Sequence, residues 1–341
     1  MKTFIIAEAG ANHNRDWKTA TDLILCAADS GSDAVKFQTY SSETLYAKNT
    51  PDFAGYTNIN QLIKDIELPR TWQKDLKLFC DDVGIEFMST PFDEKAVDEL
   101  YDIGVKRFKI AGFEATDPRI VQHAAKTGLP LIITTGIKCD ISMMKNILSW
   151  INDVSSDPDV TFLHGNHAYP TPISQICLGQ IGFLRDVNFS FPIKIGISDH
   201  TEGILIPPIA VSLGAEVVEK HFTLDRKMKG PDHPFAIEPS ELSQMVQNIR
   251  DVEISMGVRE NRVSESEKSF IHATRSIVTS RLVRKGERVS KENITTMRPW
   301  FEDSVPASKY LKLSAENRFF QNNIEAGCIV KWSDIYENSD D

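Results

Sequence analysis

The feature that most constrains this chain is a repeated alternation between short apolar runs and longer amphipathic segments. Eight apolar, often β-branched runs predict strands at 4–7, 34–37, 85–88, 105–110, 129–133, 160–163, 193–197 and 216–218. Between them, apolar residues recur at intervals of three and four, which predicts helices at 17–28, 72–82, 94–101, 118–126 and 141–152. Eight strands that alternate with helices over about 225 residues predict a (β/α)8 TIM barrel.

An open, doubly wound α/β sheet is the alternative arrangement for the same alternation. Such a sheet usually carries a glycine-rich dinucleotide turn after its first strand, with the pattern G-x-G-x-x-G. Here the first predicted strand is followed by Ala9-Gly10-Ala11-Asn12, which does not match that pattern. The sequence therefore favours the closed barrel.

The pattern changes after a predicted helix at 241–256. Residues 259–268 are polar and charged, as in a linker. Beyond them the chain contains short β-like runs and turn signals, at 276–279, 328–331 and 285–287. The expected organisation is a barrel domain at 1–262, a linker at 263–274 and a small β-rich domain at 275–341. A domain of about 65 residues buries little surface by itself, so we expect it to dock on another surface.

The composition excludes several classes of function. The chain has 38 Lys and Arg against 48 Asp and Glu, and this net charge of −10 argues against a basic face for nucleic acid. Its five cysteines form no C-x-x-C pair, so we expect neither disulfides nor a thiolate zinc site, and a cytoplasmic location. The N-terminal apolar run is too short for a signal peptide, and no run approaches the roughly 18 residues of a membrane-spanning helix. We expect a soluble protein that binds neither nucleic acid nor membrane.

Polar residues gather where the predicted strands end. Catalytic groups of a TIM barrel lie at the C-terminal ends of its strands, so these residues should meet at one mouth. The set consists of Glu8, Lys36, Gln38, Ser89, Thr90, Lys109, Glu114, Thr134, Thr135, His164, Asn166, His167, Tyr169, Ser198, Asp199, His200, Lys220 and His221. Any one of them alone could cap a helix or face water, whereas polar groups at all eight strand ends indicate a site.

Two lysines of this set, Lys36 and Lys109, lie inside runs that otherwise predict buried strands. A buried unpaired charge is costly, and a bound anion would offset that cost. Two lysines and the neighbouring hydroxyl groups could together bind a ligand that carries both a phosphate and a carboxylate group. Two histidines at neighbouring strand ends, His200 and His221, could hold a divalent metal with positions left open for water or substrate. The alternative is that each histidine is a hydrogen-bonded core residue.

Several short motifs resemble the signature blocks of the sialic acid (nonulosonic acid) synthase family. They are AEAGANHN (7–14), VKFQ (35–38), STPFD (89–93), SDHT (198–201), EKHFT (219–223) and GPDH (230–233). The resemblance runs in order from residue 4 to about residue 255. From Arg275 onward, the tail with its Lys285-Gly286-Glu287 turn resembles the antifreeze-like β-clip (SAF) domain of that family.

The resemblance implies an enzyme that condenses phosphoenolpyruvate with an N-acylated aldose and releases phosphate. The aldose would be N-acetylmannosamine or a 2,4-diacetamido-trideoxyhexose, and His200 and His221 would bind Mn²⁺ or Mg²⁺. The residues implied to surround phosphoenolpyruvate are Lys36, Thr90, Lys109, Thr134 and Ser198. Those expected to face the sugar are Gln38, Tyr169 and Asp232, and Asn166 and His167 complete the predicted substrate-binding set. Lys36 and Lys109 would stabilise the departing phosphate, and Glu114 or Asp232 would move protons.

The resemblance also implies a homodimer with exchanged C-terminal domains. In such a dimer Arg298 reaches the sugar bound by the partner subunit. Trp300 and Phe301 would then belong to a lid over the site. The alternative is that these two aromatic residues form the core of the small domain.

The chain departs from the family pattern at several positions. Gly112 stands where the family usually has a phosphate-binding serine, and His167 stands where Asn or Ser is expected. Trp300 and Phe301 replace a glycine-rich turn. The Lys-Ile-Ala-x-Phe-Glu form at 109–114 favours the pseudaminic-type branch of the family.

Two alternative functions stay open at this point. One is a related phosphoenolpyruvate-dependent 3-deoxy-sugar-acid synthase that acts on a phosphorylated sugar, against which the β-rich tail argues. The other is a non-catalytic relative that binds sugar or phosphate, for which Gly112 and His167 argue. Activity measured with a panel of acceptor sugars distinguishes the first alternative from a nonulosonic acid synthase. Phosphate release with any aldose excludes the second alternative.

Overall fold

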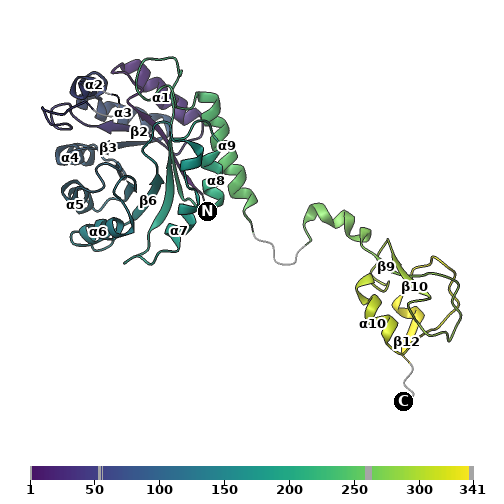
Figure 1. Cartoon of the computed structure of the whole chain (residues 1–341). Coiled ribbons are helices and arrows are strands. Elements are labelled where there is room, and N and C mark those ends of the chain that lie inside the picture. Colours follow the sequence, from purple (N-terminus) through teal and green to yellow (C-terminus); the bar gives the residue numbers. More distant parts are fainter. Residues whose placement is uncertain (1, 53–54, 56, 258–262, 338–341) are drawn as a thin grey trace. The chain divides into compact units, whose positions relative to one another are not determined.

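The computed structural model describes residues 2–52, 55, 57–257 and 263–337. The chain divides into two compact units, Met1–Gly257 and Val258–Asp341, and each has its own apolar core (Figure 1). The predicted domain boundary at residue 262 lies outside the described residues.

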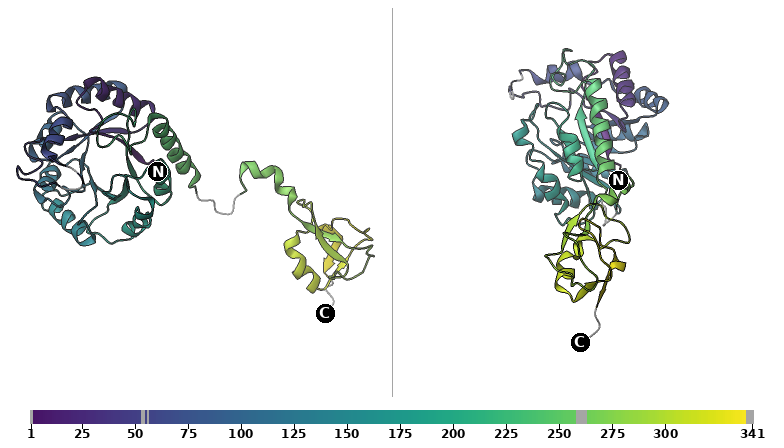
Figure 2. Two further views of the ribbon diagram at one scale, coloured as in Figure 1. Left: turned by 45° about the horizontal axis from the view of Figure 1, so that its top comes forward. Right: turned by 90° about the vertical axis from the view of Figure 1, so that its right-hand side faces the viewer.

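The first unit is a closed barrel of parallel strands. They are β1 (Phe4–Gly10), β2 (Ala34–Thr39), β3 (Glu86–Pro91), β4 (Phe108–Ile110), β5 (Leu131–Thr134), β6 (Val160–Gly165), β7 (Lys194–Asp199) and β8 (Val217–His221). Hydrogen-bonded neighbours follow the order β3-β2-β1-β8-β7-β6-β5-β4, and each pair is parallel. Because β3 and β4 also contact each other, the sheet closes into the ring seen in Figure 2. The predicted (β/α)8 barrel is confirmed.

Helices surround this barrel. They are α1 (Trp17–Asp29), α2 (Ile59–Ile66), α3 (Gln73–Val83), α4 (Glu94–Asp102), α5 (Pro118–Lys126), α6 (Ile141–Asn152), α7 (Gly179–Arg185), α8 (Ile206–Ser212) and α9 (Pro239–Ser255), with short 3-10 helices at Arg70–Trp72 and Ile173–Gln175. Four of them begin after an aspartate whose carboxylate accepts a backbone hydrogen bond from the first turn, namely Asp16, Asp93, Asp117 and Asp140. The sequence pattern does not predict α2, α7 and α8, and the last two are short and contain glycine or proline. Among the described residues, no helix has both the length and the apolar character needed to cross a bilayer.

The period of two along each strand sorts side chains between the barrel interior and the helix layer. Inward-facing apolar side chains form one layer, made of Ile6, Ala34, Met88, Ile132, Leu163 and Val217. Two residues further along five of these strands stand the polar residues Glu8, Lys36, Thr90, Thr134 and Glu219. Outward-facing residues such as Ile5 and Val35 pack in the main core against the helices. The barrel therefore places a polar layer on top of an apolar one.

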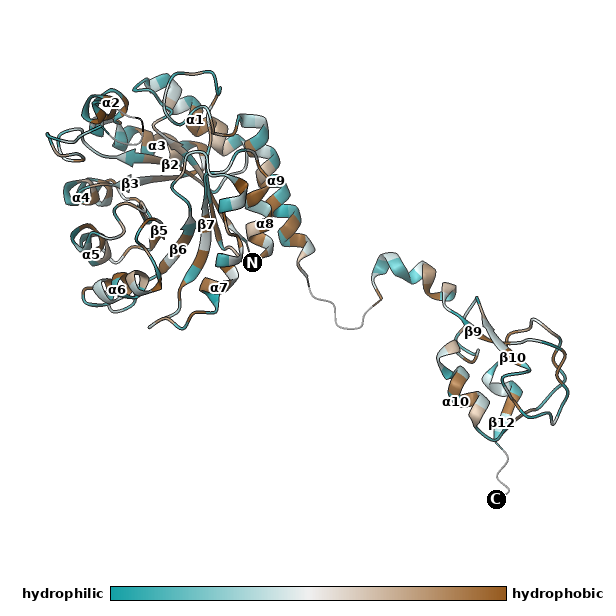
Figure 3. Cartoon of the chain, viewed as in Figure 1, coloured by the Kyte–Doolittle hydropathy of each residue, from teal (hydrophilic) through white to brown (hydrophobic). Residues whose placement is uncertain are grey.

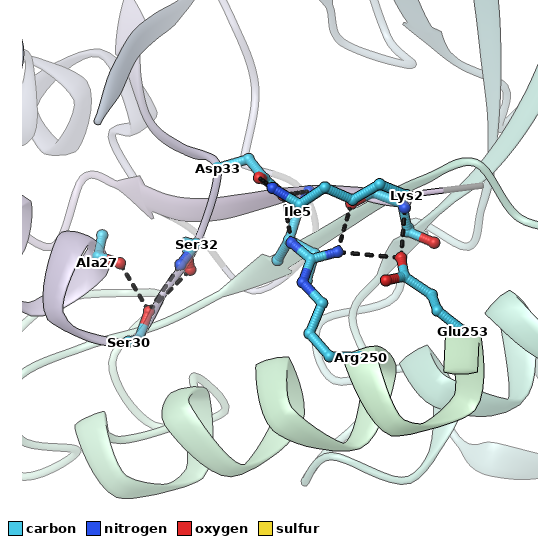
Figure 4. Close-up of polar contacts among 9 residues, drawn as sticks. Lys2, Ile5, Ala27, Ser30, Ser32, Asp33, Arg250 and Glu253 are labelled. Atoms are coloured by element: carbon cyan, nitrogen blue, oxygen red, sulfur yellow. Dashed lines mark hydrogen bonds and ion pairs between the residues drawn. The ribbon is translucent and has the colours of Figure 1, made fainter. Parts of the chain in front are cut away.

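The helix α9 completes the layer of helices around the barrel, where it contacts α8 and α1. Its buried residues are spaced by three and four, namely Leu242, Met245, Val246 and Ile249, and Figure 3 shows hydrophobic and hydrophilic residues mixed along it. On the same helix, the Arg250 guanidinium donates to Asp33 Oδ2 at 2.7 Å and to the carbonyl oxygen of Thr3 at 2.8 Å (Figure 4). Asp33 also accepts a hydrogen bond from the backbone N–H of Ile5 at 2.9 Å. Since Thr3 precedes β1 and Asp33 precedes β2, Arg250 ties the last barrel helix to the first two strands.

The described part of the second unit contains four short strands. They are β9 (Ser276–Thr279), β10 (Ile294–Met297), β11 (Arg318–Phe320) and β12 (Ile335–Glu337), with α10 (Tyr310–Ala315) and short 3-10 helices at Ala307–Lys309 and Trp332–Asp334. β9 pairs with β10 and β11 pairs with β12, both antiparallel. Its core contains Ile277, Val283, Val289, Ile294, Val305, Leu313, Phe320, Val330 and Ile335.

Two expectations for this region differ from the structure. The predicted strand at 276–279 is β9, whereas residues 328–331 form only isolated bridges, for example between Ser304 and Lys331. Residues expected to be a linker include a 3-10 helix, Glu265–Ala273, which starts with a capping box at Ser264.

Trp300 and Phe301 do not belong to the apolar core among the described residues of the second unit. Phe301 is 44% exposed and packs against His272, with ring centroids 5.1 Å apart. His272 Nδ1 lies 2.8 Å from the carbonyl oxygen of Trp300. The alternative in which this aromatic pair forms the core of the small domain is therefore wrong.

Gly196 in β7 lies where neighbouring strands leave no room for a side chain. A Cβ atom there would lie 2.3 Å from the carbonyl oxygen of Val217 and 2.6 Å from a methyl carbon of Leu163. Both neighbours belong to packed strands, so we expect Gly196→Ala to lower the free energy of unfolding by about 1–3 kcal/mol. Urea denaturation followed by circular dichroism measures the change.

Gly182→Ala in α7 is the matched control. A Cβ atom there meets no atom of the described chain within 4 Å, and alanine favours a helix over glycine. This variant should be at least as stable as the wild type. If Gly196→Ala also unfolds at the wild-type urea concentration, the close packing of β7 is contradicted.

Candidate active site

The polar layer and the strand ends beyond it line a pocket at the C-terminal mouth of the barrel. Its lining consists of Glu8, Lys36, Gln38, Thr90, Lys109, Ala111, Gly112, Phe113, Thr134, His167, Tyr169, Ser198, His200, Glu219 and His221. Eleven of these are predicted site residues, namely Glu8, Lys36, Gln38, Thr90, Lys109, Thr134, His167, Tyr169, Ser198, His200 and His221. The barrel thus brings together residues that are far apart in the sequence, and their chemical roles stay predictions.

Two lysines and two glutamates form a buried ion-pair network across this pocket, and none of these four side chains is more than 5% exposed. Lys36 Nζ lies 2.7 Å from Glu8 Oε2 and 3.6 Å from Glu219 Oε2. It also donates a hydrogen bond to Thr90 Oγ1 at 2.9 Å. Lys109 Nζ lies 3.3 Å from Glu219 Oε1. With all four groups ionised, the positive and negative charges balance.

Burial and mutual attraction shift the pKa values in this network. Burial alone would raise the pKa of Glu219, but the attraction of Lys109 and Lys36 holds that pKa well below its ordinary value. Burial raises the pKa of Glu8 to about 7, although Lys36 opposes this shift. Burial also lowers the pKa of Lys109. Glu219 is therefore the fixed anion between the lysines, and Glu8 is the carboxyl group that exchanges a proton near neutral pH.

The two predicted metal-binding histidines lie beside each other, with ring centroids 5.4 Å apart. Nδ1 of His200 donates to the carbonyl oxygen of Asn166 at 2.6 Å, so Nε2 carries the lone pair, and Ser198 Oγ lies 3.4 Å from Nε2. Burial lowers the pKa values of both histidines, so both rings are neutral at pH 7 and can act as ligands. Within the described chain, no group of three or more His, Cys, Asp or Glu side chains is placed to hold a metal ion. A metal held by these two histidines would need further ligands from substrate or water.

Two further predicted residues, Glu114 and Asp232, have carboxyl groups that titrate near neutral pH. Burial raises the pKa of Glu114 to about 7 and the pKa of Asp232 to about 6. Asp232 Oδ2 lies 3.7 Å from His221 Nδ1. Neither carboxyl group is among the described residues that line the pocket. Groups that gain and lose a proton near pH 7 suit general acid–base catalysis.

Several buried polar atoms in and beside the pocket have no hydrogen-bond partner in the part of the chain that the structure describes. They are Glu114 Oε2, Thr134 Oγ1, His167 Nδ1 and His221 Nδ1. Buried polar atoms are nearly always hydrogen-bonded in folded proteins. A cluster of exceptions at one barrel mouth therefore marks a place that a polar ligand completes.

Other predicted residues have partners within the protein. Gln38 Nε2 donates to Glu8 Oε1 at 3.1 Å, and Ser198 Oγ donates to Glu219 Oε1 at 2.8 Å. The ring of Tyr169 packs on His200, with centroids 4.2 Å apart. These contacts fix the side chains around the ion-pair network and the histidines.

Asn166 is not among the described residues that line the pocket. The side-chain oxygen of Asn166 accepts a hydrogen bond from the backbone of Ala168 at 2.9 Å, and its amide donates to the carbonyl oxygen of Gln175 at 3.3 Å. Asn166 instead orients His200 through its backbone carbonyl. Arg298 belongs to the second unit, where it is exposed, and its predicted contact with the sugar stays a prediction.

Glu219 is the central residue that the sequence-based prediction omits. It lies two residues before His221 on β8, and alternate residues of a strand face the same side. If His221 points into the barrel, Glu219 must do so as well. This alternation is the sequence signal from which Glu219 could have been predicted.

Comparison with known proteins agrees with this geometry. The NeuB family model matches residues 23–261, and the SAF domain model matches residues 274–335. The N,N'-diacetyllegionaminic acid synthase of Legionella pneumophila is 37% identical over 98% of this chain and 95% of its own length. The pseudaminic acid synthase of Campylobacter jejuni strain 81-176 is 33% identical over 98% of this chain and 97% of its own length. The crystal structure of N-acetylneuraminic acid (sialic acid) synthetase from Leptospira borgpetersenii is 32% identical, with a TM-score of 0.71, and covers 80% of this chain and 91% of that one.

Replacing Glu219 tests the ion-pair network. Glu219→Gln leaves Lys109 without its anionic partner and removes one of the two that face Lys36, and breaking a buried pair costs about 3–5 kcal/mol. The pKa of Glu219 is lower in the folded protein than in the unfolded chain. Its contribution to the free energy of unfolding is therefore fully present above the unfolded-state pKa and is lost only as the pH falls through the folded-state pKa. The stability difference should therefore persist from about pH 8 to about pH 5 in urea titrations.

Glu43→Gln, at an exposed position, is the control and should change stability by less than about 0.5 kcal/mol. Equal losses in the two variants would mean that the network does not hold the barrel mouth together.

Proposed function

This chain belongs to the NeuB family, the sialic acid synthase family that its motifs resemble, and we propose that it is a nonulosonic acid synthase. It would join phosphoenolpyruvate to an N-acylated aldose and release phosphate. The observation that carries this proposal is the pair of buried lysines in a pocket with unsatisfied polar atoms. A substrate with both a phosphate and a carboxylate group would supply the anionic oxygens that two buried lysines can bind.

Phosphoenolpyruvate would lie between Lys36 and Lys109. Thr90, Thr134 and Ser198 end three other strands of the same pocket and would supply hydroxyl donors. Lys36 and Lys109 now contact Glu8 and Glu219, so the incoming anion would compete with these carboxylates for the ammonium groups. Such charge-assisted hydrogen bonds would also stabilise the phosphate as it departs.

The second half of the pocket would hold the sugar and a divalent metal. His200 and His221 would bind Mn²⁺ or Mg²⁺ because both rings are neutral and Nε2 of His200 carries the lone pair, with Ser198 Oγ 3.4 Å away. When bound, the metal would polarise the aldehyde of the open-chain sugar. Gln38 and Tyr169 line the same pocket and would position the sugar.

The reaction would form a bond between the methylene carbon of phosphoenolpyruvate and the aldehyde carbon. Water would then add to the carbon that carries the phosphate, and the bond from that carbon to the phosphate oxygen would break. These steps move protons to the new hydroxyl group and away from the added water. Glu114 and Asp232 suit these transfers because burial brings their pKa values to about 7 and about 6.

The sugar is proposed from the names of the relatives. The legionaminic acid synthase is more similar to this chain than the pseudaminic acid synthase. We therefore favour a 2,4-diacetamido-trideoxyhexose of the legionaminic series over the pseudaminic series that the motif at 109–114 favours. N-acetylmannosamine is the second candidate.

Phosphate release tests the proposed reaction. The protein is mixed with phosphoenolpyruvate, Mn²⁺ and one of three acceptors: N-acetylmannosamine, its 6-phosphate, or 2,4-diacetamido-trideoxyhexoses. We expect release only when both substrates are present, fastest with a diacetamido sugar and abolished by a chelator. Lys109→Ala should raise the KM for phosphoenolpyruvate about ten- to a hundredfold, because it removes a charged hydrogen bond.

The sugar 6-phosphate as the best acceptor would instead support a 3-deoxy-sugar-acid synthase of the phosphorylated-sugar type. No release with any acceptor would contradict the proposed condensation.

We also propose that the protein is a homodimer in which Arg298 completes the partner's site. Support comes from the family resemblance and from the exposed aromatic side chains of the second unit, Phe301 and Trp332. Two variants that impair the site, Lys109→Ala and Arg298→Ala, are co-expressed with different affinity tags and assayed at a phosphoenolpyruvate concentration at which neither has appreciable activity alone. Random mixing makes half of the dimers hybrids with one intact site each, so about a quarter of wild-type activity should return.

Each variant expressed alone is the control. A monomer by light scattering, or no activity in purified hybrids, would reject the exchanged dimer.

A further inference from the structure

Two charged residues at the ends of β7 and β8, Asp199 and Lys220, face away from the pocket. The sequence places them among the polar strand ends that should meet at the barrel mouth. Their neighbours on either side in the chain line the pocket, whereas these two residues are not among its described lining. Because alternate residues of a strand face opposite sides, the side chains of Asp199 and Lys220 face the surrounding helices.

Asp199 and Lys220 stand opposite each other on the two neighbouring strands and form a buried ion pair. Lys220 Nζ lies 2.8 Å from Asp199 Oδ2, and the two side chains are 2% and 0% exposed. We call this contact the outer ion pair. Two residues earlier on the same strands stand Ile197 and Val218, which belong to the main apolar core. The outer ion pair therefore replaces apolar packing on this side of the barrel wall.

The outer ion pair also makes directed hydrogen bonds that apolar packing cannot supply. A packed apolar pair of similar size stabilises a core about as well as a buried ion pair does, so stability alone does not account for the charges. Asp199 Oδ1 accepts a hydrogen bond from the backbone N–H of Thr201 at 2.9 Å. Lys220 Nζ donates to the carbonyl oxygen of the same residue. Both charged groups thus hold the peptide groups of Thr201.

These hydrogen bonds fix the main chain on both sides of His200. Asp199 precedes it and Thr201 follows it, and both are held by the ammonium group of one lysine. The carbonyl oxygen of His200 accepts a hydrogen bond from the backbone N–H of Thr171 at 2.9 Å, and its ring donates to the carbonyl oxygen of Asn166. The backbone and the ring of His200 are therefore both restrained.

The same ammonium group connects His200 to His221. Lys220 directly precedes His221 at the end of β8, and the rings of the two histidines have centroids 5.4 Å apart. A shift of His200 relative to β8 would break the contacts of Lys220 with the main chain around His200. The outer ion pair thus couples the positions of the two histidines from the side of the barrel wall that faces the helices.

We propose that Asp199 and Lys220 are positioning residues, which hold His200 and His221 beside each other so that both rings can bind one divalent metal ion. The inference rests on the proposed function, in which the two histidines are metal ligands, and deepens it. Asp199 and Lys220 act through the main chain of these ligands and not as ligands themselves. Groups that orient metal ligands influence metal affinity strongly.

The first test measures the binding of Mn²⁺ alone to the full-length protein, from the EPR signal of the free ion. Lys220→Met leaves the carboxylate of Asp199 buried without an opposite charge, so this single variant should be unstable. The double variant Asp199→Asn, Lys220→Met buries no charge, and its amide oxygen can still accept the hydrogen bond from Thr201. We expect the Kd of the double variant for Mn²⁺ to rise about ten- to a hundredfold.

Arg250→Met is the control for a loss of stability alone. Arg250 forms ion pairs with Asp33 and Glu253 and contacts the chain before β1, at the opposite end of the barrel from the histidines. This variant should unfold at a lower urea concentration and bind Mn²⁺ with the wild-type Kd. If it weakens Mn²⁺ binding as much as the double variant does, the effect is a general loss of stability and the inference is overturned.

The outcomes separate this inference from the proposed function. If the wild type does not bind Mn²⁺, the metal site of the proposed function fails, and this inference fails with it. If the wild type binds Mn²⁺ and the folded double variant binds it with the same Kd, only the role of the outer ion pair fails. Circular dichroism shows whether each variant is folded.

The second test follows the histidine rings without metal, by NMR of protein with isotopically labelled histidine. The signals of His200 are identified by their loss in His200→Ala. In the wild type this ring should be one fixed tautomer with its proton on Nδ1, because the carbonyl oxygen of Asn166 accepts that proton. In the double variant the signals should average between the two tautomers, while those of His123 on the outer helix α5 stay unchanged. A wild-type His200 ring that already averages, or unchanged His200 signals in the double variant, would overturn the inference.

Discussion

The structure depends on how two ammonium groups are kept inside the barrel. Lys36 and Lys109 are almost completely buried, and an isolated charge in such a place costs several kcal/mol. Glu8 and Glu219 supply the opposite charges from β1 and β8. Because these partners sit on separate strands, the network holds the strand ends together around a common centre. The hydroxyl groups, the histidines and the pocket are arranged around it.

This constraint also bears on how the proposed anionic substrate would enter a chain with a net charge of −10. The long-range field of such a protein repels anions, so attraction must come from groups at short distance. Each lysine keeps a carboxylate partner while the pocket is free of substrate, and phosphoenolpyruvate would exchange its own oxygens for that partner. The raised pKa of Glu8 means that this carboxyl group can become neutral at little cost when more negative charge arrives.

Local patterns in the sequence predict most of the fold and many of the residues that line the candidate active site. Strand runs, helical spacing and aspartate caps act over a few residues, so the barrel and helices such as α5 and α6 follow from them. The prediction omits Glu219 because it names only Lys220 and His221 at this strand end, although alternation makes Glu219 and His221 face the same way. The substrate contact of Asn166 stays a prediction, because sequence alone does not distinguish a side chain that binds substrate from one that holds a loop. The close approach of residues 112 and 136 to the imidazole of His167 depends on the closed barrel, which brings three strand ends together.

The most direct test of this account is a crystal structure of the protein grown with phosphoenolpyruvate and Mn²⁺. The account predicts that phosphate and carboxylate oxygens lie about 2.7–2.9 Å from Nζ of Lys36 and of Lys109, the distance of charge-assisted hydrogen bonds. It also predicts that the contacts of Glu8 and Glu219 with these lysines lengthen as the substrate takes their place. Phosphoenolpyruvate bound elsewhere, with both lysine–glutamate contacts unchanged, would contradict it.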